Sequence, residues 1–492
     1  MRRPLALAVV CVALLLAGCQ APGSPAEQTP LGGDAGQTDA AATPTEPAVD
    51  LAVNGSAPDA PTADRLGYEN GYWYNESLAV TTEDGLNETE REAVVARTMA
   101  RVERIRGLEF EETVPVSVVS RAEYRNSTGG GDTGESLRRF DNAKFEALFF
   151  VGEDRDSIAV QSSNRGESVL GYYSSRRGEI VVVSDSETPT ISRGTLAHEL
   201  VHALQDQQFG LGSDANTRDG VQGRNGLIEG DAVATRQIYS ERCAATWECI
   251  ETPTSGGGGG GDRHFGISFM LYFPYSDGPG LVSDLRERGG WNAVNDAYGD
   301  HPDSAVEVTY PARYPEWERA SVSLADRSSA DWERVRPSTD RDRPDYAVVG
   351  PSAIAASMAY TLADDYNDSA VVRTGDVINY ESDGSLRSED PYNYDLPATD
   401  GWRGGRMHVY ANGGETAYVW KTRWDSEADA SEFARAWERV VVHWGGSQRA
   451  DGTWVIADDS PYADAISISV DGRTVTVVNA PTAAELDEVH DA

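Results

Sequence analysis

The 492-residue sequence is poor in lysine: only Lys144 and Lys421 occur. Its 42 basic residues face 80 acidic ones, which gives a formal net charge of −38. Such a surface repels itself in dilute buffer, but at roughly molar salt the Debye length falls to about 3 Å and the repulsion is largely screened. The composition therefore predicts a halophilic protein. It also argues against nucleic acid as a partner, because that partner is itself polyanionic.

Apolar residues are not scarce, which argues against the interpretation of this acidic chain as a disordered protein. Hydrophobic residues make up 39% of the chain, with 11 Trp and 21 Tyr. An acidic disordered protein would have few of these residues, so we expect a folded chain with a buried core. The length allows two or three domains of ordinary size.

The N-terminus has the form of an export signal. Arg2 and Arg3 precede an apolar run from Leu5 to Ala17, which is too short for a standard membrane-spanning helix. The letters LAGC, ending at Cys19, resemble a lipobox, so residues 1–19 are predicted to be a lipoprotein signal peptide with Cys19 lipidated. The alternative is an ordinary signal peptide with a coincidental cysteine. The lipobox predicts a protein anchored by lipid to the membrane, on the extracellular face of the cell.

The chain has only four cysteines, and two of them lie in or at the end of the signal. The remaining pair, Cys243 and Cys249, reads as a local disulfide in an exported protein, with two free thiols as the alternative. A zinc site built on these cysteines would need further ligands nearby, and the sequence supplies none.

Residues 20–63 are rich in Pro, Thr, Ala, Gly and Asp, with almost no large apolar residues. Such a segment cannot bury enough surface to fold and is predicted to be a disordered linker. Five sequons are candidates for glycosylation on an exported chain: Asn54, Asn75, Asn87, Asn126 and Asn367.

Hydrophobic periodicity predicts an α+β fold, with strands and helices mixed along the chain. Strands are expected at 114–120, 156–162, 169–174 and 178–184, with the last two in a hairpin. Helices are expected at 88–108, at 196–209 between a Thr195 cap and a Gly210 cap, and at 227–244. In the C-terminal part we expect helices at 351–366 and 428–440 and hairpins at 406–424 and 465–478.

The stretch HELVH carries two of only seven histidines, His198 and His202. On a helix, residues i and i+4 lie on one face, so the two imidazoles can point at one metal ion. Glu199 is rotated by about 100° from His198, which lets it reach a metal-activated water without ligating the metal. Asp206 continues the histidine face. The pattern predicts a zinc site with Glu199 as general base.

A catalytic zinc ion takes three protein ligands and keeps one position open. Glu229 lies on the predicted second helix and is the natural third ligand. Asp231 could orient a ligand imidazole, a role that such sites commonly give to a carboxylate. The alternatives are a pair of satisfied helix histidines, a solvated acid at Glu229, and plain surface or capping acids at Asp231 and Asp206.

The stretch HELVHALQD resembles the zinc helix of thermolysin-like gluzincins, which read HExxHAxxD and take a glutamate ligand from a following helix. The resemblance implies that His198, His202 and Glu229 bind Zn²⁺ and that Glu199 is the base. The chain departs from the pattern at Val233, where gluzincins usually carry an aspartate four residues after the ligand glutamate.

Most of the chain after about residue 90 resembles exported gluzincin-like proteins of bacteria and archaea, including haloarchaeal surface lipoproteins. Relatives tend to carry a histidine before the proline of the YPARY block, where this chain has Tyr310. The shared blocks read here GYYSSRRGEIVVV, TLAHELVHALQDQQFG, GLIEGDA, GGWNAVNDAYGDHPDSAVEVTYPARY, GWRGGRMHVY and VWKTRWDSEADASEF.

We therefore expect an α+β, thermolysin-like metallopeptidase domain at 64–320, a surface connection at 321–347 and a C-terminal α/β unit at 348–492. The expected function is a cell-surface peptidase that hydrolyses a peptide or protein substrate through zinc-activated water. The rival is a catalytically inactive, gluzincin-like surface binding or structural lipoprotein. An oxyanion needs a donor besides zinc, and the candidates, each also readable as structural, are Tyr239, Arg236, His264 and Tyr310.

Overall fold

The computed structural model describes residues 61, 64–128, 133–166, 169, 171–186, 188–250, 263–337, 344–387 and 390–490. Helices alternate with strands of three sheets in this part, which confirms the predicted α+β class. None of its helices is long and apolar enough to cross a bilayer. The predicted signal peptide with Cys19, and Asn54 of the linker, lie outside the described residues.

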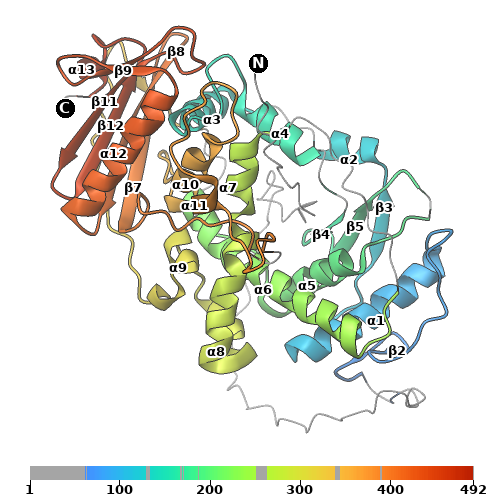
Figure 1. Cartoon of the computed structure of the whole chain (residues 1–492). Coiled ribbons are helices and arrows are strands. Elements are labelled where there is room, and N and C mark those ends of the chain that lie inside the picture. The colour runs from blue at the N-terminus through green and yellow to red at the C-terminus, as the bar shows by residue number, and fades with distance from the viewer. Residues whose placement is uncertain are drawn as a thin grey trace, which may run out of the picture.

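The first part of the described chain is mainly helical (Figure 1). Its elements are β1 (Tyr68–Glu69), β2 (Tyr72–Trp73), α1 (Glu88–Arg106), β3 (Val116–Val119), α2 (Arg121–Thr128), α3 (Glu135–Ala147), α4 (Ser157–Gly166), β4 (Gly171–Ser174), β5 (Glu179–Val183), α5 (Arg193–Phe209), α6 (Arg218–Ala245), α7 (Phe265–Ser276), α8 (Gly278–Asp296), η1 (Ala297–Gly299), α9 (Ala305–Thr309) and η2 (Pro311–Arg313).

The second part adds a large sheet and its covering helices. Its elements are β6 (Glu333–Arg334), α10 (Pro351–Tyr360), α11 (Thr374–Val377), β7 (Trp402–Asn412), β8 (Glu415–Trp424), α12 (Glu427–His443), β9 (Gly446–Gln448), β10 (Trp454–Ile456), β11 (Ala465–Asp471), β12 (Thr474–Ala480) and α13 (Leu486–Val489).

The HELVH helix α5 packs on a three-stranded sheet of order β3-β5-β4, in which β3 runs parallel and β4 antiparallel to β5. The β4–β5 hairpin and the end of the helix at Gly210 are confirmed. Leu200 and Leu204, one turn apart, are buried with Ile180 and Val182 of β5 in one apolar cluster. The side of α5 that carries these leucines therefore packs on the sheet, and α6 packs against α5 as well.

The second predicted helix is longer than the expected range 227–244. It begins nine residues earlier, at a cap formed by Thr217, whose side chain accepts a backbone N–H of the first turn. Gly230 lies against the backbone of Gly278 in α8, since a Cβ at position 230 would come within 2.4 Å of it. Gly230, directly after Glu229, thus lets α8 pack closely against the part of α6 that carries Glu229.

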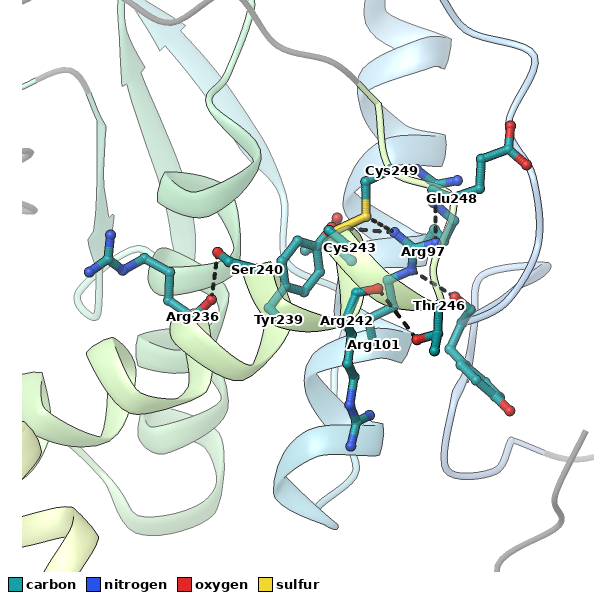
Figure 2. The surroundings of a disulfide bond; sticks show 12 residues. Arg97, Arg101, Arg236, Tyr239, Ser240, Arg242, Cys243, Thr246, Glu248 and Cys249 are labelled. Atoms are coloured by element: carbon teal, nitrogen blue, oxygen red, sulfur yellow. Dashed lines mark hydrogen bonds between the residues drawn. A yellow bond between two sulfur atoms is a disulfide. The ribbon is translucent and has the colours of Figure 1, made fainter. Parts of the chain in front are cut away.

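A disulfide joins Cys243 to Cys249 at the C-terminal end of α6 (Figure 2). Arg101 of α1 donates to the Glu248 carbonyl at 2.8 Å and lies 3.3 Å from the Cys249 sulfur. The disulfide and the guanidinium together hold this end of α6 beside α1.

The large sheet is antiparallel throughout, with strand order β6-β7-β8-β12-β11-β10-β9, and both predicted hairpins are confirmed. Side chains of β8 alternate between its two faces. Trp420 packs against Phe433 and Trp437 of α12, while Val419 joins Leu486 of α13 in a separate cluster. Helices thus cover both faces of this sheet, with α12 lying along one of them (Figure 1).

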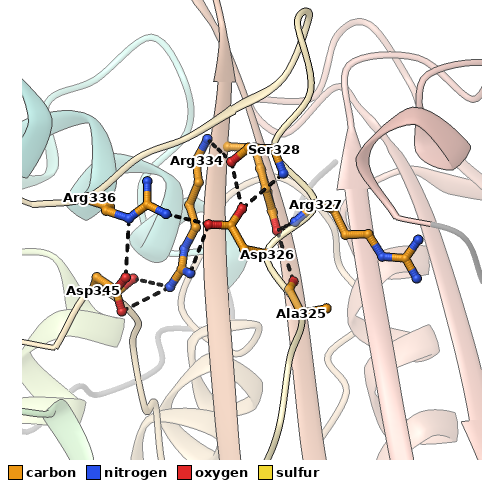
Figure 3. A network of polar contacts seen from close by, with 8 residues as sticks. Ala325, Asp326, Arg327, Ser328, Arg334, Arg336 and Asp345 are labelled. Carbon is orange, nitrogen blue, oxygen red and sulfur yellow. Dashed lines mark hydrogen bonds and ion pairs between the residues drawn. The ribbon is translucent and has the colours of Figure 1, made fainter.

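Residues 321–347, predicted as a surface connection, are partly built into the fold. Trp332 is fully buried, and β6 adds an edge strand to the large sheet. Asp326 forms ion pairs with both Arg334 and Arg336 (Figure 3). The charged composition of this segment therefore reflects an ion-pair network, and the limits of the connection at 321–347 stay a prediction.

Two local predictions are wrong. The segment 156–162 was expected as a strand, but from Ser157 on it forms helix α4, and Asp156 before it accepts the Ala159 N–H at 2.8 Å. Helix α5 begins one turn earlier than expected, so its cap position is held by Ser192 and Thr195 lies inside the helix.

One apolar core extends through both parts of the described chain. Helix α10 packs against α7 and α6, which belong to the first part. The ring of Phe149, just after α3, stacks on Trp444 beyond α12. The domain limits near 320 and 348 stay predictions, while the packing joins the two parts.

Candidate metal centre

Side chains of His198, His202 and Glu229 converge between α5 and α6. The two histidine Nε2 atoms are 3.1 Å apart, and Glu229 Oε2 lies 3.2 Å from the first and 3.3 Å from the second. Helical spacing puts both imidazoles on one face of α5, and α6 carries the glutamate to that face. The three ligands named from the sequence are therefore brought together.

The three converging atoms fit a tetrahedral metal ion. Ligands about 2.0–2.1 Å from a tetrahedral zinc ion are about 3.3 Å apart, which matches the separations of 3.1 to 3.3 Å. His202 Nδ1 faces the Gln205 Oε1 acceptor at 2.9 Å, so a neutral His202 keeps its lone pair on Nε2. This lone pair lies beside a carboxylate oxygen, an arrangement that a cation stabilises.

The candidate ligand side chains are withdrawn from solvent: His198 is 5% exposed, and His202 and Glu229 are each 1% exposed. Burial lowers the pKa of His198 to about 4, although its hydrogen bond to Glu229 opposes this. Burial alone would raise the pKa of Glu229, but protonation of the neighbouring histidines, His202 above all, holds it well below its usual range. Neutral imidazoles and an ionised carboxylate are the states that bind metal.

Glu199 lies beside the ligands and is 1% exposed. Its Oε2 accepts the backbone N–H of Tyr173, on strand β4, at 2.8 Å. Its Oε1 has no hydrogen-bond partner among the described residues. Burial raises the pKa of Glu199 to about 8, and the His202 charge and the Tyr173 N–H oppose this only in part.

Asp231 does not contact a ligand imidazole directly, contrary to the expectation from the sequence. Gln205 stands between them: its Oε1 faces His202 Nδ1 at 2.9 Å, and its Nε2 donates to Asp231 Oδ2 at 3.2 Å. The sequence holds a signal for Gln205 that was missed, because it lies three residues after His202 and shares its helix face.

Asp206 supports strand β4 and not the metal ligands. Its Oδ2 accepts the hydroxyl of Tyr173 at 2.9 Å, and its Oδ1 accepts the Leu211 N–H at 3.1 Å. The predicted role of Asp206 at the metal is therefore replaced by a role in positioning β4 on α5.

Val233, where gluzincins usually carry an acid, lies in an apolar cluster with Tyr272, Tyr275 and Tyr392. The Tyr275 ring is nearly parallel to the His198 ring, with centroids 6.0 Å apart. An aspartate at position 233 would be buried among these aromatic rings. The valine therefore suits this position, and nothing in the sequence signalled the aromatic wall beside His198.

Three of the four candidate oxyanion donors are engaged elsewhere. Tyr239 accepts a hydrogen bond from an arginine of α1, His264 caps α7, and Tyr310 donates to an aspartate. Arg236 lies close enough to His198 to contribute to lowering its pKa. Of the four, Arg236 is thus the one on the side of the metal ligands.

The described sequons differ in their surroundings. Asn126, Asn367 and Asn87 are exposed, whereas Asn75 is half-buried. The Asn87 side chain caps α1 by accepting the Glu90 N–H at 3.1 Å, so a glycan there would compete with the cap.

Residues 333–490 match a family described as "Domain of unknown function (DUF8575)". No curated protein and no solved structure matches the chain. The family match covers the elements from β6 to α13 and so the large sheet. The converging ligands on α5 and α6 lie before it.

Proposed function

We propose that the protein is a cell-surface, zinc-dependent peptidase of the gluzincin type, with a thermolysin-like arrangement around α5 and α6. The convergence of His198, His202 and Glu229 to within 3.1 to 3.3 Å of one another carries this proposal. Two histidines and one glutamate would leave one position of a tetrahedral ion open, as catalysis requires.

Glu199 would act as the general base on a peptide or protein substrate. A zinc ion, when bound, supplies Lewis acidity that polarises a carbonyl and lowers the pKa of water to about 7. Glu199 takes the proton of the attacking water and passes it to the leaving amine. The Tyr173 N–H holds Oε2, and Oε1 has no hydrogen-bond partner among the described residues, so Oε1 is the oxygen that would transfer the proton.

The lipobox at Cys19 supports a place on the extracellular face of the membrane, and the Cys243–Cys249 disulfide suits an oxidising compartment outside the cell. A Cys19→Ser variant should lose lipid labelling and should no longer sediment with membranes. Unchanged sedimentation of this variant would contradict the anchor.

The experiment is metal analysis and peptide cleavage with purified wild type and Glu199→Gln in molar salt. Both proteins should hold about one zinc ion per chain, and only the wild type should cleave. General acid–base catalysis contributes roughly 10²–10⁴-fold, so the variant should lose activity on that scale. Glu287→Gln, an exposed change on α8, is the matched control and should keep full activity.

The second candidate is a surface protein that binds metal without catalysis, and the near-complete burial of the three ligands favours it. Structural zinc sites are closed, and their metal contributes to folding. This candidate predicts bound zinc, a lower melting temperature after chelation and no cleavage by folded wild type. A metal-free, inert and folded wild type would exclude both candidates.

A further inference from the structure

Gln205 bridges a metal ligand and a buried acid. Its Oε1 lies 2.9 Å from His202 Nδ1, and its Nε2 donates to Asp231 Oδ2 at 3.2 Å and to the Ile228 carbonyl at 3.0 Å. Gln205, His202 and Asp231 are each at most 1% exposed. Solvent therefore does not compete for these bonds, and loss of one of them leaves a buried polar group without its partner.

The orientation of the Gln205 amide is determined by its neighbours. Its nitrogen faces two acceptors, Asp231 Oδ2 and the Ile228 carbonyl. A flipped amide would place an oxygen against both of them, so Oε1 must face His202. An oxygen there requires a donor, which puts the His202 proton on Nδ1 and leaves the lone pair on Nε2.

Asp231 is held in place by helices other than its own. Arg106 of α1 approaches its carboxylate with Nε at 2.8 Å and Nη2 at 3.0 Å. The hydroxyl of Tyr298, in η1, donates to Oδ2 at 2.9 Å. The Arg106 guanidinium also lies 4.2 Å over the ring of Trp291. These buried contacts orient the Asp231 carboxylate, whose Oδ2 is the acceptor for Gln205.

We propose that Gln205 is the positioning residue of the metal centre: it holds His202 in the Nδ1–H tautomer, so that Nε2 faces the metal, and the Arg106–Asp231 ion pair locks its amide. This inference rests on the metal site of the proposed function. It gives Gln205 the role at the His202 imidazole that the sequence had suggested for Asp231. His198 has no comparable partner on Nδ1 among the described residues, so Gln205 acts through His202 alone.

The test compares wild type, Gln205→Leu and Gln205→Glu, with Gln208→Leu as the matched control on the same helix. Among the described residues, the Gln208 side chain donates only to the Glu109 carbonyl. Zinc affinity is measured by competition with a chromophoric chelator in molar salt. The tautomer of His202 in the metal-free protein is read by ¹⁵N NMR of labelled histidine, with His202→Gln identifying the resonance.

Gln205→Leu should bind zinc about 10- to 100-fold more weakly, the usual cost of losing such support. Gln205→Glu keeps an oxygen facing Nδ1 but turns its second oxygen toward Asp231 Oδ2 and the Ile228 carbonyl, so it should recover part of this loss only when that oxygen carries a proton. Gln208→Leu should bind like the wild type. In the wild type, His202 should carry its proton on Nδ1. This measurement does not need Gln205→Leu, so it tests the proposal even where that variant does not fold.

Zinc binding by Gln205→Leu within twofold of the wild type, or a wild-type His202 protonated on Nε2, would overturn the role of Gln205 while leaving the metal site intact. A wild type that binds no zinc would instead overturn the proposed function, and the positioning role with it.

Discussion

The backbone N–H of Tyr173 donates to Glu199 Oε2 at 2.8 Å, and the hydroxyl of the same tyrosine donates to Asp206 Oδ2 at 2.9 Å. The two acceptors are seven residues apart, which is two helical turns. One residue of an edge strand is thereby attached to α5 at two points. Because one Glu199 oxygen is held by the backbone, the orientation of this carboxylate depends on where β4 lies.

Tyr173→Phe keeps the backbone bond to Glu199 and removes the bond to Asp206. We expect a loss of roughly 0.5–1.5 kcal/mol in the free energy of unfolding, the usual net worth of one hydrogen bond, with zinc content unchanged. Urea unfolding monitored by circular dichroism measures this. Tyr172→Phe is the control on the same strand, since its hydroxyl interacts with Arg177 and its ring packs against Tyr124, away from α5. A Tyr173→Phe protein as stable as the wild type would show that the double attachment does not stabilise β4.

Gly230→Ala should disturb the helix that carries Glu229. The added Cβ would lie within 2.4 Å of the Gly278 backbone, so α6 and α8 must separate. Overpacking of this kind costs about 1–3 kcal/mol, and the shift of α6 should weaken zinc binding as well. Gly280→Ala is the matched control, because nothing lies within 4 Å of its added Cβ. Equal stability and equal zinc affinity in the two variants would contradict the close contact of α6 and α8.

Glu146→Gln should stabilise the protein near neutral pH. Carboxylate oxygens of Glu146, Glu153 and Asp464 lie within 4.8 Å of one another. Burial, together with the neighbouring Asp464, raises the pKa of Glu146 well above its usual value, and burial raises the pKa of Asp464 to about 8. The folded state therefore keeps protons that the unfolded state releases.

The sign of the pH dependence follows from these raised pKa values. Between about pH 4 and pH 8 unfolding releases protons from Glu146 and Asp464, so stability falls as pH rises through this window. Gln at position 146 removes one of the two groups. Its stability advantage should be small at pH 4 and reach roughly 1–3 kcal/mol at pH 8, the cost of an unsatisfied buried group. Urea unfolding at several pH values in fixed salt measures this, with Glu287→Gln as control, and a pH-independent difference would contradict it.

Salt should raise the melting temperature of the whole protein. The net charge of −38 opposes the compact state in dilute buffer. Raising sodium chloride from about 0.1 M to molar concentration shortens the Debye length from about 10 Å to about 3 Å, so stability should rise steeply over this range. Scanning calorimetry checks this against a neutral osmolyte at matched osmolality. An equal rise with the osmolyte would show that screening is not the cause.

Local sequence predicted those elements whose signals lie within one turn or one hairpin. The helix that became α1 and the β4–β5 hairpin are confirmed, because periodicity and turn chemistry act over a few residues. Residues 156–162 were misread as a strand even though Asp156 offered a cap signal. The burial of Trp332, within the predicted connection, could not be predicted because it depends on strands formed far along the chain.

The same division holds at the candidate metal centre. That His198 and His202 share a helix face follows from their spacing alone, since helix geometry is local. Spacing also puts Gln205 on the face of His202, but it does not show that Asp231 reaches His202 only through Gln205. This arrangement depends on Arg106, which is 125 residues away from Asp231 in the chain and orients that carboxylate toward α5. Helical periodicity therefore accounts for the two histidines, and only the packing of α1, α5 and α6 against one another decides which side chains hold them in place.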